Sequence, residues 1–238
     1  MKELYYDFHL HSCLSPCADA AMTPRNIVNM LALAGYDIIA VSDHNSTLNC
    51  PAVTAAAAEA GLIAVPAMEL TTQEEVHVLC LLPDLAAAKE FGEYVYSRLP
   101  NINNKPEIFG RQLHINEQDK PIKEVEKLLV SATDIGIYDV YGLVKSYGGT
   151  VIPAHIDRPA FSLISNLGIY DPELQFPLVE VSKNCAGAEF KAAHNLNLQH
   201  IINSDAHSLE QIPDPEHKIW VSDLTAHGVI QAIEGNRR

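Results

Sequence analysis

The chain has 238 residues, of which 47% are hydrophobic and 19% are charged, a composition typical of a folded globular protein and not of a disordered or repetitive one. Its formal net charge of −14 argues against non-specific binding to long nucleic acids or anionic membranes, because like charges repel. This acidic chain contains eleven histidines, and histidine is the commonest protein ligand of transition metals.

The amino-terminal residues do not resemble a signal peptide, because no apolar run follows a basic flank. No stretch approaches the ~18 consecutive apolar residues that cross a bilayer. Five cysteines without paired spacing favour free thiols or metal ligands over disulfides. We therefore expect a cytoplasmic protein that makes no use of a membrane.

Short β-rich runs alternate with helical patterns along the chain. We expect strands over residues 5–9, 37–42, 62–69, 77–82, 150–154, 178–181, 200–204 and 219–221. We expect helices over residues 24–35, 51–61, 84–98, 122–132 and 137–147, and a last helix from residue 225. Thr23 and Pro24 are typical of the start of a helix and Gly35 of its end.

No linker or internal repeat divides the sequence, so we predict a single domain over residues 1–238 with an irregular insert at about 99–121. Seven or eight strands that alternate with helices favour an α/β fold of the barrel type. In such folds the functional residues lie on loops at the carboxyl ends of the strands.

Metal-ligand residues gather at these predicted strand ends. His9 and His11 occupy alternate positions of the first strand, so both side chains face the same way and can share one cation. The ends of other strands carry five further candidates: His44, Glu69, His155, Asp205 and His207. Each alone has an ordinary explanation, such as a capped turn or a buried histidine. Their coincidence at one edge of the fold predicts a metal site.

His77 begins its predicted strand instead of ending it. Only residues 70–76 separate it from Glu69, and a parallel crossover needs about a dozen residues or more. The two strands must then be antiparallel neighbours, which places His77 beside Glu69 at the same edge.

Eight nitrogen or oxygen ligands exceed the needs of one ion and suit two or three. A pair of ions ~4 Å apart can activate a hydroxide and stabilise a substrate oxygen, so the predicted chemistry is hydrolysis. A structural zinc site is usually rich in cysteine at short spacing, and this sequence lacks that pattern.

The ligand motifs are similar to those of the PHP family, named for polymerase and histidinol-phosphatase domains. They cover the whole chain and read Asp7-Phe8-His9-Leu10-His11-Ser12, Ser42-Asp43-His44-Asn45, Ala67-Met68-Glu69, His77, Pro153-Ala154-His155 and Asn203-Ser204-Asp205-Ala206-His207. The resemblance implies a metal-dependent phosphoesterase on a distorted (β/α)7 barrel. It also implies two or three divalent ions, with Zn, Fe or Mn as candidates.

The resemblance further implies which residues share each ion. The three implied sets are His9, His11, Glu69 and Asp205; Glu69, His77 and His155, with Glu69 as the bridge; and His44 with His207 and a residue of the loop after His11. The family uses His or Asp at that loop position, whereas this sequence has Cys17. A thiolate favours zinc or iron over manganese or magnesium. Asp19 is close enough to serve instead.

Three further residues are candidates for roles beside the metal ions. Arg158 and Lys183 follow predicted strand ends and could hold phosphate oxygens, or could form surface ion pairs. Asp43, next to His44, is interpreted as an orienting residue or a proton acceptor.

The insert and the last unassigned cysteine leave two more possibilities open. His114 with Arg111 could reach over the site as a lid or a leaving-group acid. Cys185 could line the pocket or be a buried thiol.

We therefore expect a phosphoesterase that hydrolyses a small phosphate ester, a phosphomonoester or a nucleotide-type substrate, with a hydroxide activated by several metal ions. No long nucleic acid is expected as partner. Two alternatives stay open. An amidohydrolase-like C–N hydrolase also carries paired histidines on its first strand, but its family uses a bridging lysine where this chain has Glu69. The other is a non-catalytic regulatory module stabilised by metal.

Overall fold

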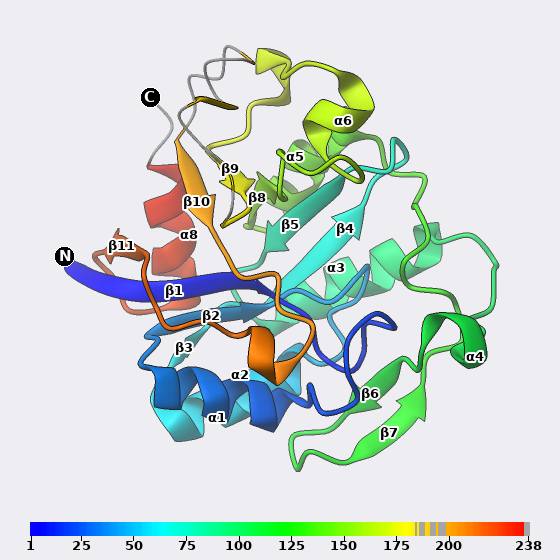
Figure 1. Cartoon of the computed structure of the whole chain (residues 1–238), viewed down its shortest axis with the longest axis vertical. Coiled ribbons are helices and arrows are strands. Elements are labelled where there is room, and N and C mark those ends of the chain that lie inside the picture. Colours follow the sequence, from blue (N-terminus) through cyan, green and yellow to red (C-terminus); the bar gives the residue numbers. More distant parts are fainter. Residues whose placement is uncertain (184, 186–188, 191–193, 195–198, 236–238) are drawn as a thin grey trace.

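The computed structural model describes residues 1–183, 185, 189–190, 194 and 199–235. Its strands are β1 (Lys2–Leu10), β2 (Ile38–Val41), β3 (Ile63–Ala64), β4 (Ala67–Thr71), β5 (His77–Leu81), β6 (Leu113–Ile115), β7 (Pro121–Glu124), β8 (Thr150–Pro153), β9 (Val179–Val181), β10 (His200–Ile202) and β11 (Lys218–Val221). Its α-helices are α1 (Pro24–Ala34), α2 (Cys50–Ala60), α3 (Leu85–Arg98), α4 (Pro106–Phe109), α5 (Ile137–Ser146), α6 (Leu163–Leu167) and α8 (Ala226–Glu234), and two 3₁₀ turns are η1 (Pro172–Leu174) and η2 (Leu209–Gln211). Figure 1 shows strands in the interior and helices around them.

The strands form four separate hydrogen-bonded sheets. Their orders are β11-β1-β2-β3, β4-β5-β8, β10-β9 and β6-β7. Strands β1, β2 and β3 are parallel, as are β9 and β10, whereas β5 is antiparallel to both β4 and β8. The mixed α/β character agrees with the sequence, but the described residues contain no continuous ladder, so the expected closed barrel is not confirmed.

Strand β5 shows how the interior is built. Val78 and Cys80 belong to a core that also includes Phe91 of α3. Leu79 belongs to a second core, together with the inward-facing Phe8 of β1. Both faces of β5 are therefore buried, as expected for a central strand. Side chains from the separate sheets converge on one apolar interior even though their ladders are not joined.

Helix α1 begins and ends as expected. The Thr23 hydroxyl accepts a hydrogen bond from Asn26 N–H, and Pro24 occupies the first turn, where its missing N–H costs nothing. Gly35 has a φ of 97°, a left-handed conformation that residues with a Cβ rarely adopt. The buried positions Ile27, Val28 and Leu31 follow helical spacing, so this helix covers β1 and β2.

Two predicted elements differ from the structure. The strand expected over 62–69 is divided into β3 and β4 at Pro66, which has no N–H to contribute to a ladder. The helix expected over 122–132 is wrong, because residues 121–124 form β7. The backbone that follows β7 is instead bonded to Gln112, whose side-chain amide donates to the carbonyls of Val125 and Lys127 and accepts from Leu129 N–H. A buried amide from outside the segment thus overrides the local pattern.

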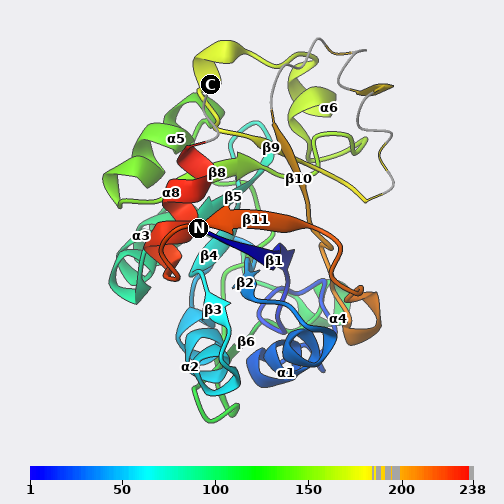
Figure 2. The ribbon, with the colours of Figure 1, turned by 90° about the vertical axis from the view of Figure 1, so that its left-hand side faces the viewer.

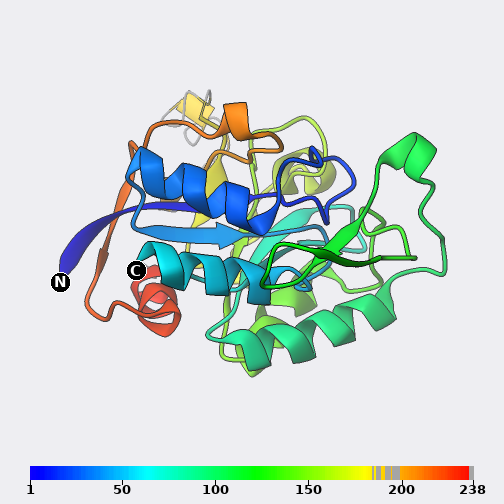
Figure 3. The ribbon, with the colours of Figure 1, turned by 90° about the horizontal axis from the view of Figure 1, so that it is seen from below.

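The insert predicted at about 99–121 contains α4 and β6, and the hairpin partner β7 follows at its end. Figure 2 shows α1 and α2 side by side at one end of the molecule, with α3, α5 and α8 grouped elsewhere. Figure 3 shows α4 projecting on the side opposite the N-terminus. Among the described residues, no helix has the length and apolar character required to cross a bilayer.

Candidate metal centre

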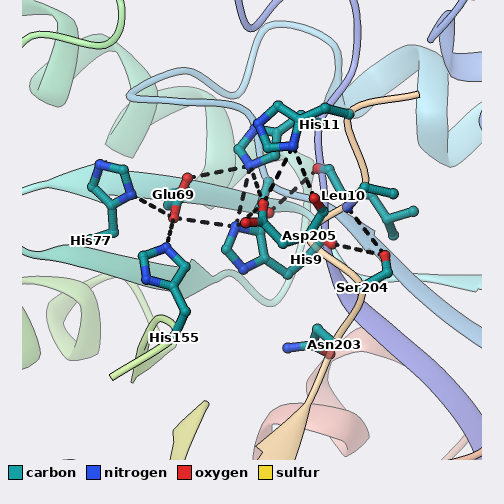
Figure 4. A network of polar contacts seen from close by, with 12 residues as sticks. His9, Leu10, His11, Glu69, His77, His155, Asn203, Ser204 and Asp205 are labelled. Carbon is teal, nitrogen blue, oxygen red and sulfur yellow. Dashed lines mark hydrogen bonds and ion pairs between the residues drawn. The ribbon is translucent and has the colours of Figure 1, made fainter. Parts of the chain in front are cut away.

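The paired histidines of β1 lie at the centre of the site. His9 and His11 are both fully buried, and their Nε2 atoms lie 3.2 Å apart. Each Nε2 also faces Asp205, whose Oδ1 lies 3.2 Å from that of His9 and 3.1 Å from that of His11. Figure 4 shows both rings pointing toward Asp205 and Glu69. The predicted alternation along the strand is confirmed.

Glu69 of β4 is the hub of the cluster. Its carboxylate is buried and has five imidazole nitrogens within 3.3 Å. They belong to His9, His11, His44, His77 and His155. His77 Nδ1 is the nearest at 2.9 Å, and β5 is antiparallel to β4 with His77 opposite Thr71. The antiparallel placement predicted for His77 is therefore confirmed (Figure 4).

Neighbouring strand ends are held together at this point. Residues beyond β2 and β10 form isolated parallel bridges, His44 with Glu69 and Leu10 with Ala206. Positive φ angles, which are uncommon for residues with a Cβ, occur at Asn45 (46°), His155 (28°) and Asp205 (50°). The cluster therefore coincides with backbone conformations that the surrounding structure must hold in place.

Side chains of the cluster converge in three sets whose ligand atoms lie within 4.8 Å of one another. These sets are His9, His11 and Asp205; His44, Glu69 and His77; and His11, His44 and His207. The rings of His11 and His207 are stacked with centroids 4.3 Å apart. Nitrogen and carboxylate donors at this spacing are those that Zn, Fe and Mn bind.

Unpartnered polar atoms support a fit to metal ions. His44 Nδ1 and Glu69 Oε2 are buried and have no hydrogen-bond partner, although they lie only 3.1 Å apart. Buried polar atoms are normally paired, and exceptions require an explanation. A cation between the two atoms would satisfy both, so the residues present fit the divalent ions expected from the sequence.

The cluster combines ionised carboxylates with both charged and neutral rings. Although burial opposes it, the facing carboxylates raise the pKa of His9 well above its usual value and that of His11 to about 9. Burial alone would raise the pKa of Glu69, but the charges of His77 and His9 outweigh it and hold this pKa well below its usual value. Burial lowers the pKa of His44 well below its usual value, and burial with the charge of His11 lowers that of His207 to about 4. Glu69 is thus ionised while His44 and His207 keep free lone pairs, as metal ligands must.

The cluster opens into a cavity of about 210 Å³. The lining residues are Cys17, His44, Glu69, His77, Val130, His155, Arg158, Phe161, Asp205 and His207. We call His9, His11 and Glu69 the inner group, because all three are almost fully buried. We call Cys17, Arg158 and Phe161 the rim, because each lines the cavity and is exposed.

Cys17 and Asp19, the two residues considered as the last ligand of the third ion, differ in their position relative to the cavity. Cys17 lines the cavity. Asp19 does not line it, although its backbone N–H donates to the carbonyl of His207. Of the two, only Cys17 lines the cavity together with His44 and His207, and neither belongs to the three converging sets.

Arg158 lines the cavity and Lys183 does not. Arg158 Nη1 lies 2.6 Å from Asp205 Oδ2, and 43% of its side chain is exposed. Beside it, Phe161 stacks on His77 with a centroid distance of 4.8 Å. Lys183 is exposed after β9. Of the two predicted phosphate-binding cations, only Arg158 lies at the cavity.

Asp43 lies behind the cluster and is buried. Its carboxylate accepts hydrogen bonds from Ser12 N–H, from the Ser12 hydroxyl and from the Ser15 hydroxyl. The Ser15 oxygen in turn lies 3.1 Å from His11 Nδ1. Asp43 therefore reaches His11 through Ser15, and it does not line the cavity.

The lid role raised for the insert and the pocket-lining role raised for Cys185 are not supported, whereas the thiol of Cys185 packs as its other interpretation expected. His114 lines a separate cavity of about 750 Å³ between α2, α3 and the β6–β7 hairpin. Arg111 forms an exposed ion pair with Glu124. Cys185 is half-buried, packs against an apolar core and does not line the metal cavity.

Sequence reasoning missed Glu180. This residue lies in the middle of β9, is 2% exposed, and both its oxygens lie 3.0 Å from His9 Nδ1. The available signal was an acidic residue within the apolar run Leu178–Val181, since carboxylates are rarely fully buried without a partner.

Comparisons with known proteins give similarities of fold. No family model matches the sequence. The uncharacterized protein YqxK of Bacillus subtilis is 26% identical over 168 residues, which cover 67% of this chain and 37% of that protein.

Three solved structures resemble nearly the whole chain at 20% identity. The lesion-specific endonuclease PfuEndoQ from Pyrococcus furiosus has a TM-score of 0.66, with 98% of this chain and 56% of that chain covered. An amidohydrolase from Chromobacterium violaceum with bound sulfate and no metal has a TM-score of 0.60, with 98% and 96% covered. A protein from Bifidobacterium adolescentis assigned as a metal-dependent phosphoesterase has a TM-score of 0.58, also with 98% and 96% covered. The chain spans just over half of the endonuclease and well under half of YqxK. This chain shares the fold of the three solved structures, the endonuclease, the amidohydrolase and the phosphoesterase.

Proposed function

We propose that this protein is a metal-dependent phosphoesterase of the PHP type that hydrolyses a small phosphate ester, a phosphomonoester or a nucleotide-type substrate. One observation carries the proposal: a buried carboxylate, Glu69, faces five imidazoles beside a cavity that also holds a guanidinium, that of Arg158. Five free cysteines agree with a reducing, cytoplasmic setting.

The proposed ligands form three overlapping sets. They are His9, His11, Glu69 and Asp205; Glu69, His77 and His155; and His44, His207 and Cys17. When bound, divalent Zn, Fe or Mn would lower the pKa of water at the site and offset the charge of the phosphate. The sharing of Glu69 between the first two sets is supported by its two oxygens facing histidines of different sets: Oε1 lies 2.9 Å from His77 Nδ1, and Oε2 lies 3.3 Å from His11 Nε2.

Asp43 has a positioning role in this proposal. The Ser15 hydroxyl has one proton, which it donates to Asp43 Oδ1 at 2.7 Å. Its oxygen accepts from His44 N–H, so the remaining contact with His11 Nδ1 is also one in which Ser15 accepts. His11 Nδ1 then carries a proton, so the form that binds a metal, with Nε2 deprotonated, presents the Nε2 lone pair to the cluster. Asp43 orients a ligand through Ser15 and does not touch the substrate.

Arg158 is proposed to bind the non-bridging oxygens of the phosphate. Its guanidinium is partly exposed at the rim and has further donors beyond the one that faces Asp205. Lys183 lies outside the cavity, so we assign it at most a long-range electrostatic effect. A cavity of about 210 Å³ suits a small ester better than a polymer.

The main alternative substrate is DNA. Endonuclease Q, which resembles this chain at a TM-score of 0.65 and 19% identity, was solved with a duplex that carries an abasic lesion at the active site. This chain covers only 57% of that protein, and its net charge is −14. Long polyanions would be repelled unless a basic surface lay beside the site, so we favour the small substrate.

The proposal is tested with protein purified without added metal. Metal content is measured first, and release of phosphate or alcohol is then followed for phosphomonoesters, phosphodiesters and an abasic DNA duplex, each with Mn²⁺, Fe²⁺ or Zn²⁺. We expect turnover of a small ester. Activity on neither ester class would overturn the proposal and leave the metal-stabilised module, whereas hydrolysis of C–N bonds alone would favour the amidohydrolase alternative.

Two variants test whether turnover depends on the metal cluster. Asp205→Ala removes a carboxylate that faces both histidines of β1 and should abolish turnover together with part of the metal content. Glu234→Gln changes a half-buried carboxylate that contacts Thr150 and Lys145, far from the site, and should keep both. Full activity of Asp205→Ala would remove the basis of the assignment.

A further inference from the structure

Glu180 is the buried carboxylate closest to the cluster that has no place among the proposed ligands. It is 2% exposed at the centre of β9. Three different groups surround it: the ring of His9, the backbone N–H of His155 and the side-chain amide of Asn203. An ionised carboxylate in such a place is stable only when hydrogen bonds satisfy its oxygens.

For two of these partners, the direction of the hydrogen bond to Glu180 is fixed. The backbone N–H of His155 can only donate, and it lies 3.0 Å from Glu180 Oε1. Asn203 Oδ1 accepts from the backbone N–H of Phe8 at 2.9 Å, which fixes the orientation of its amide. The Asn203 NH₂ group therefore faces Glu180 Oε2, at 2.6 Å. Both oxygens of Glu180 must be acceptors.

The orientation of the His9 proton follows. His9 Nδ1 lies 3.0 Å from both oxygens of Glu180, so Nδ1 must carry a proton and donate it. A metal ion can bind Nε2 only after that nitrogen has lost its proton, and in the resulting neutral imidazole the proton on Nδ1 leaves the lone pair on Nε2. This Nε2 is the atom that faces Glu69 and Asp205 at 3.2 Å.

We propose that Glu180 is a positioning residue that selects the Nδ1-protonated tautomer of His9 and thereby aims the Nε2 lone pair at the metal ions. Asn203 supports this arrangement, because its NH₂ group donates to Glu180 and its Oδ1 accepts from Phe8 N–H. The inference rests on the proposed metal centre and adds to it the residue that sets the chemical state of its first ligand. A carboxylate in this position also makes the ring a stronger donor to a metal.

A substitution of one atom tests the idea. Glu180→Gln keeps the size of the side chain but turns one oxygen into an NH₂ group. If that group faces His155 N–H, two donors meet; if it faces Asn203, two donors meet again. Neither orientation of the new amide satisfies the hydrogen bonds of His9, His155 and Asn203 together. His9 must then either lose its support or change its tautomer.

The measurement is the affinity of metal-free protein for Zn²⁺ in competition with a chelator. Loss of such a supporting partner weakens metal binding by ~10–100-fold, and we expect a loss of this size for the weakened ion in Glu180→Gln. Glu234→Gln serves as the matched control and should bind Zn²⁺ like the wild type. Glu180→Gln with wild-type affinity would overturn the inference.

A second measurement needs no variant. In the Zn²⁺-loaded wild type, ¹⁵N NMR of the His9 ring should show a proton on Nδ1 and zinc on Nε2; coordination through Nδ1 would contradict the proposal. The outcomes are separable from those of the proposed function. Zinc bound through Nε2 without phosphoesterase activity would refute the proposed function and keep the role of Glu180. Phosphoesterase activity and Zn²⁺ affinity at the wild-type level in Glu180→Gln would keep the proposed function and refute the role of Glu180.

Discussion

The inner group and the rim of the same cavity are held in place very differently. His9 and His11 are fully buried, and each has its Nδ1 next to a buried hydrogen-bond acceptor, Glu180 for His9 and Ser15 with Asp43 for His11. Arg158 and Phe161 are 43% and 44% exposed. The proposed metal ligands of the inner group are thus held by hydrogen bonds from buried neighbours, while the rim residues proposed to meet a substrate keep freedom to adjust.

This comparison predicts that changes to the inner group have larger effects than changes to the rim. The largest is expected for Glu69→Gln, because Glu69 is the carboxylate that five imidazoles share. Turnover should fall by more than the ~100-fold expected for loss of a merely supporting partner. The check is kcat measured with saturating Mn²⁺ or Zn²⁺. A fall of less than tenfold would show that Glu69 is not a shared ligand.

Arg158→Ala should have an intermediate effect. A hydrogen bond to a charged group contributes ~1.5–3 kcal/mol, so we expect kcat/KM to fall by ~10–100-fold, mainly through a higher KM. Metal affinity should change much less than kcat/KM, since Arg158 offers no ligand atom and only its ion pair with Asp205 is lost. Lys183→Ala is the control and should change kcat/KM by about twofold at most. A larger effect of Lys183→Ala than of Arg158→Ala would reverse the assignment of the phosphate-binding cation.

The smallest effect is expected for Cys17→Ser. The change replaces a soft thiolate donor by a hard oxygen, so preference should move from Zn²⁺ or Fe²⁺ toward Mn²⁺, with total activity under the best metal kept within about tenfold. Activities measured with each ion in wild type and variant give the answer. An unchanged order of preference would show that Cys17 does not bind an ion.

Sequence reasoning located the cluster because its ligands obey a simple rule. His9, His44, His155 and Asp205 all lie at or beyond the carboxyl end of a strand, and such ends meet at one edge of an α/β fold. His77 was placed by loop length alone, since the short connection from Glu69 requires an antiparallel return.

The features that the sequence did not predict depend on contacts between residues far apart in the chain. Glu180 is 171 residues from His9, and no local pattern links them. The false helix at 122–132 had apolar positions at helical spacing, but the Gln112 side chain supplies hydrogen bonds that a helix would have supplied itself. Position relative to the cavity also separated Arg158, which lines it, from Lys183, which does not.

The central claim is that the inner group binds several divalent ions through a shared Glu69. The most direct test is to load metal-free protein with Zn²⁺, remove unbound ions by gel filtration and count the ions per chain by mass spectrometry. The account predicts two or three ions for the wild type and at least one fewer for Glu69→Gln. No bound ion in the wild type, or equal numbers in both proteins, would contradict it.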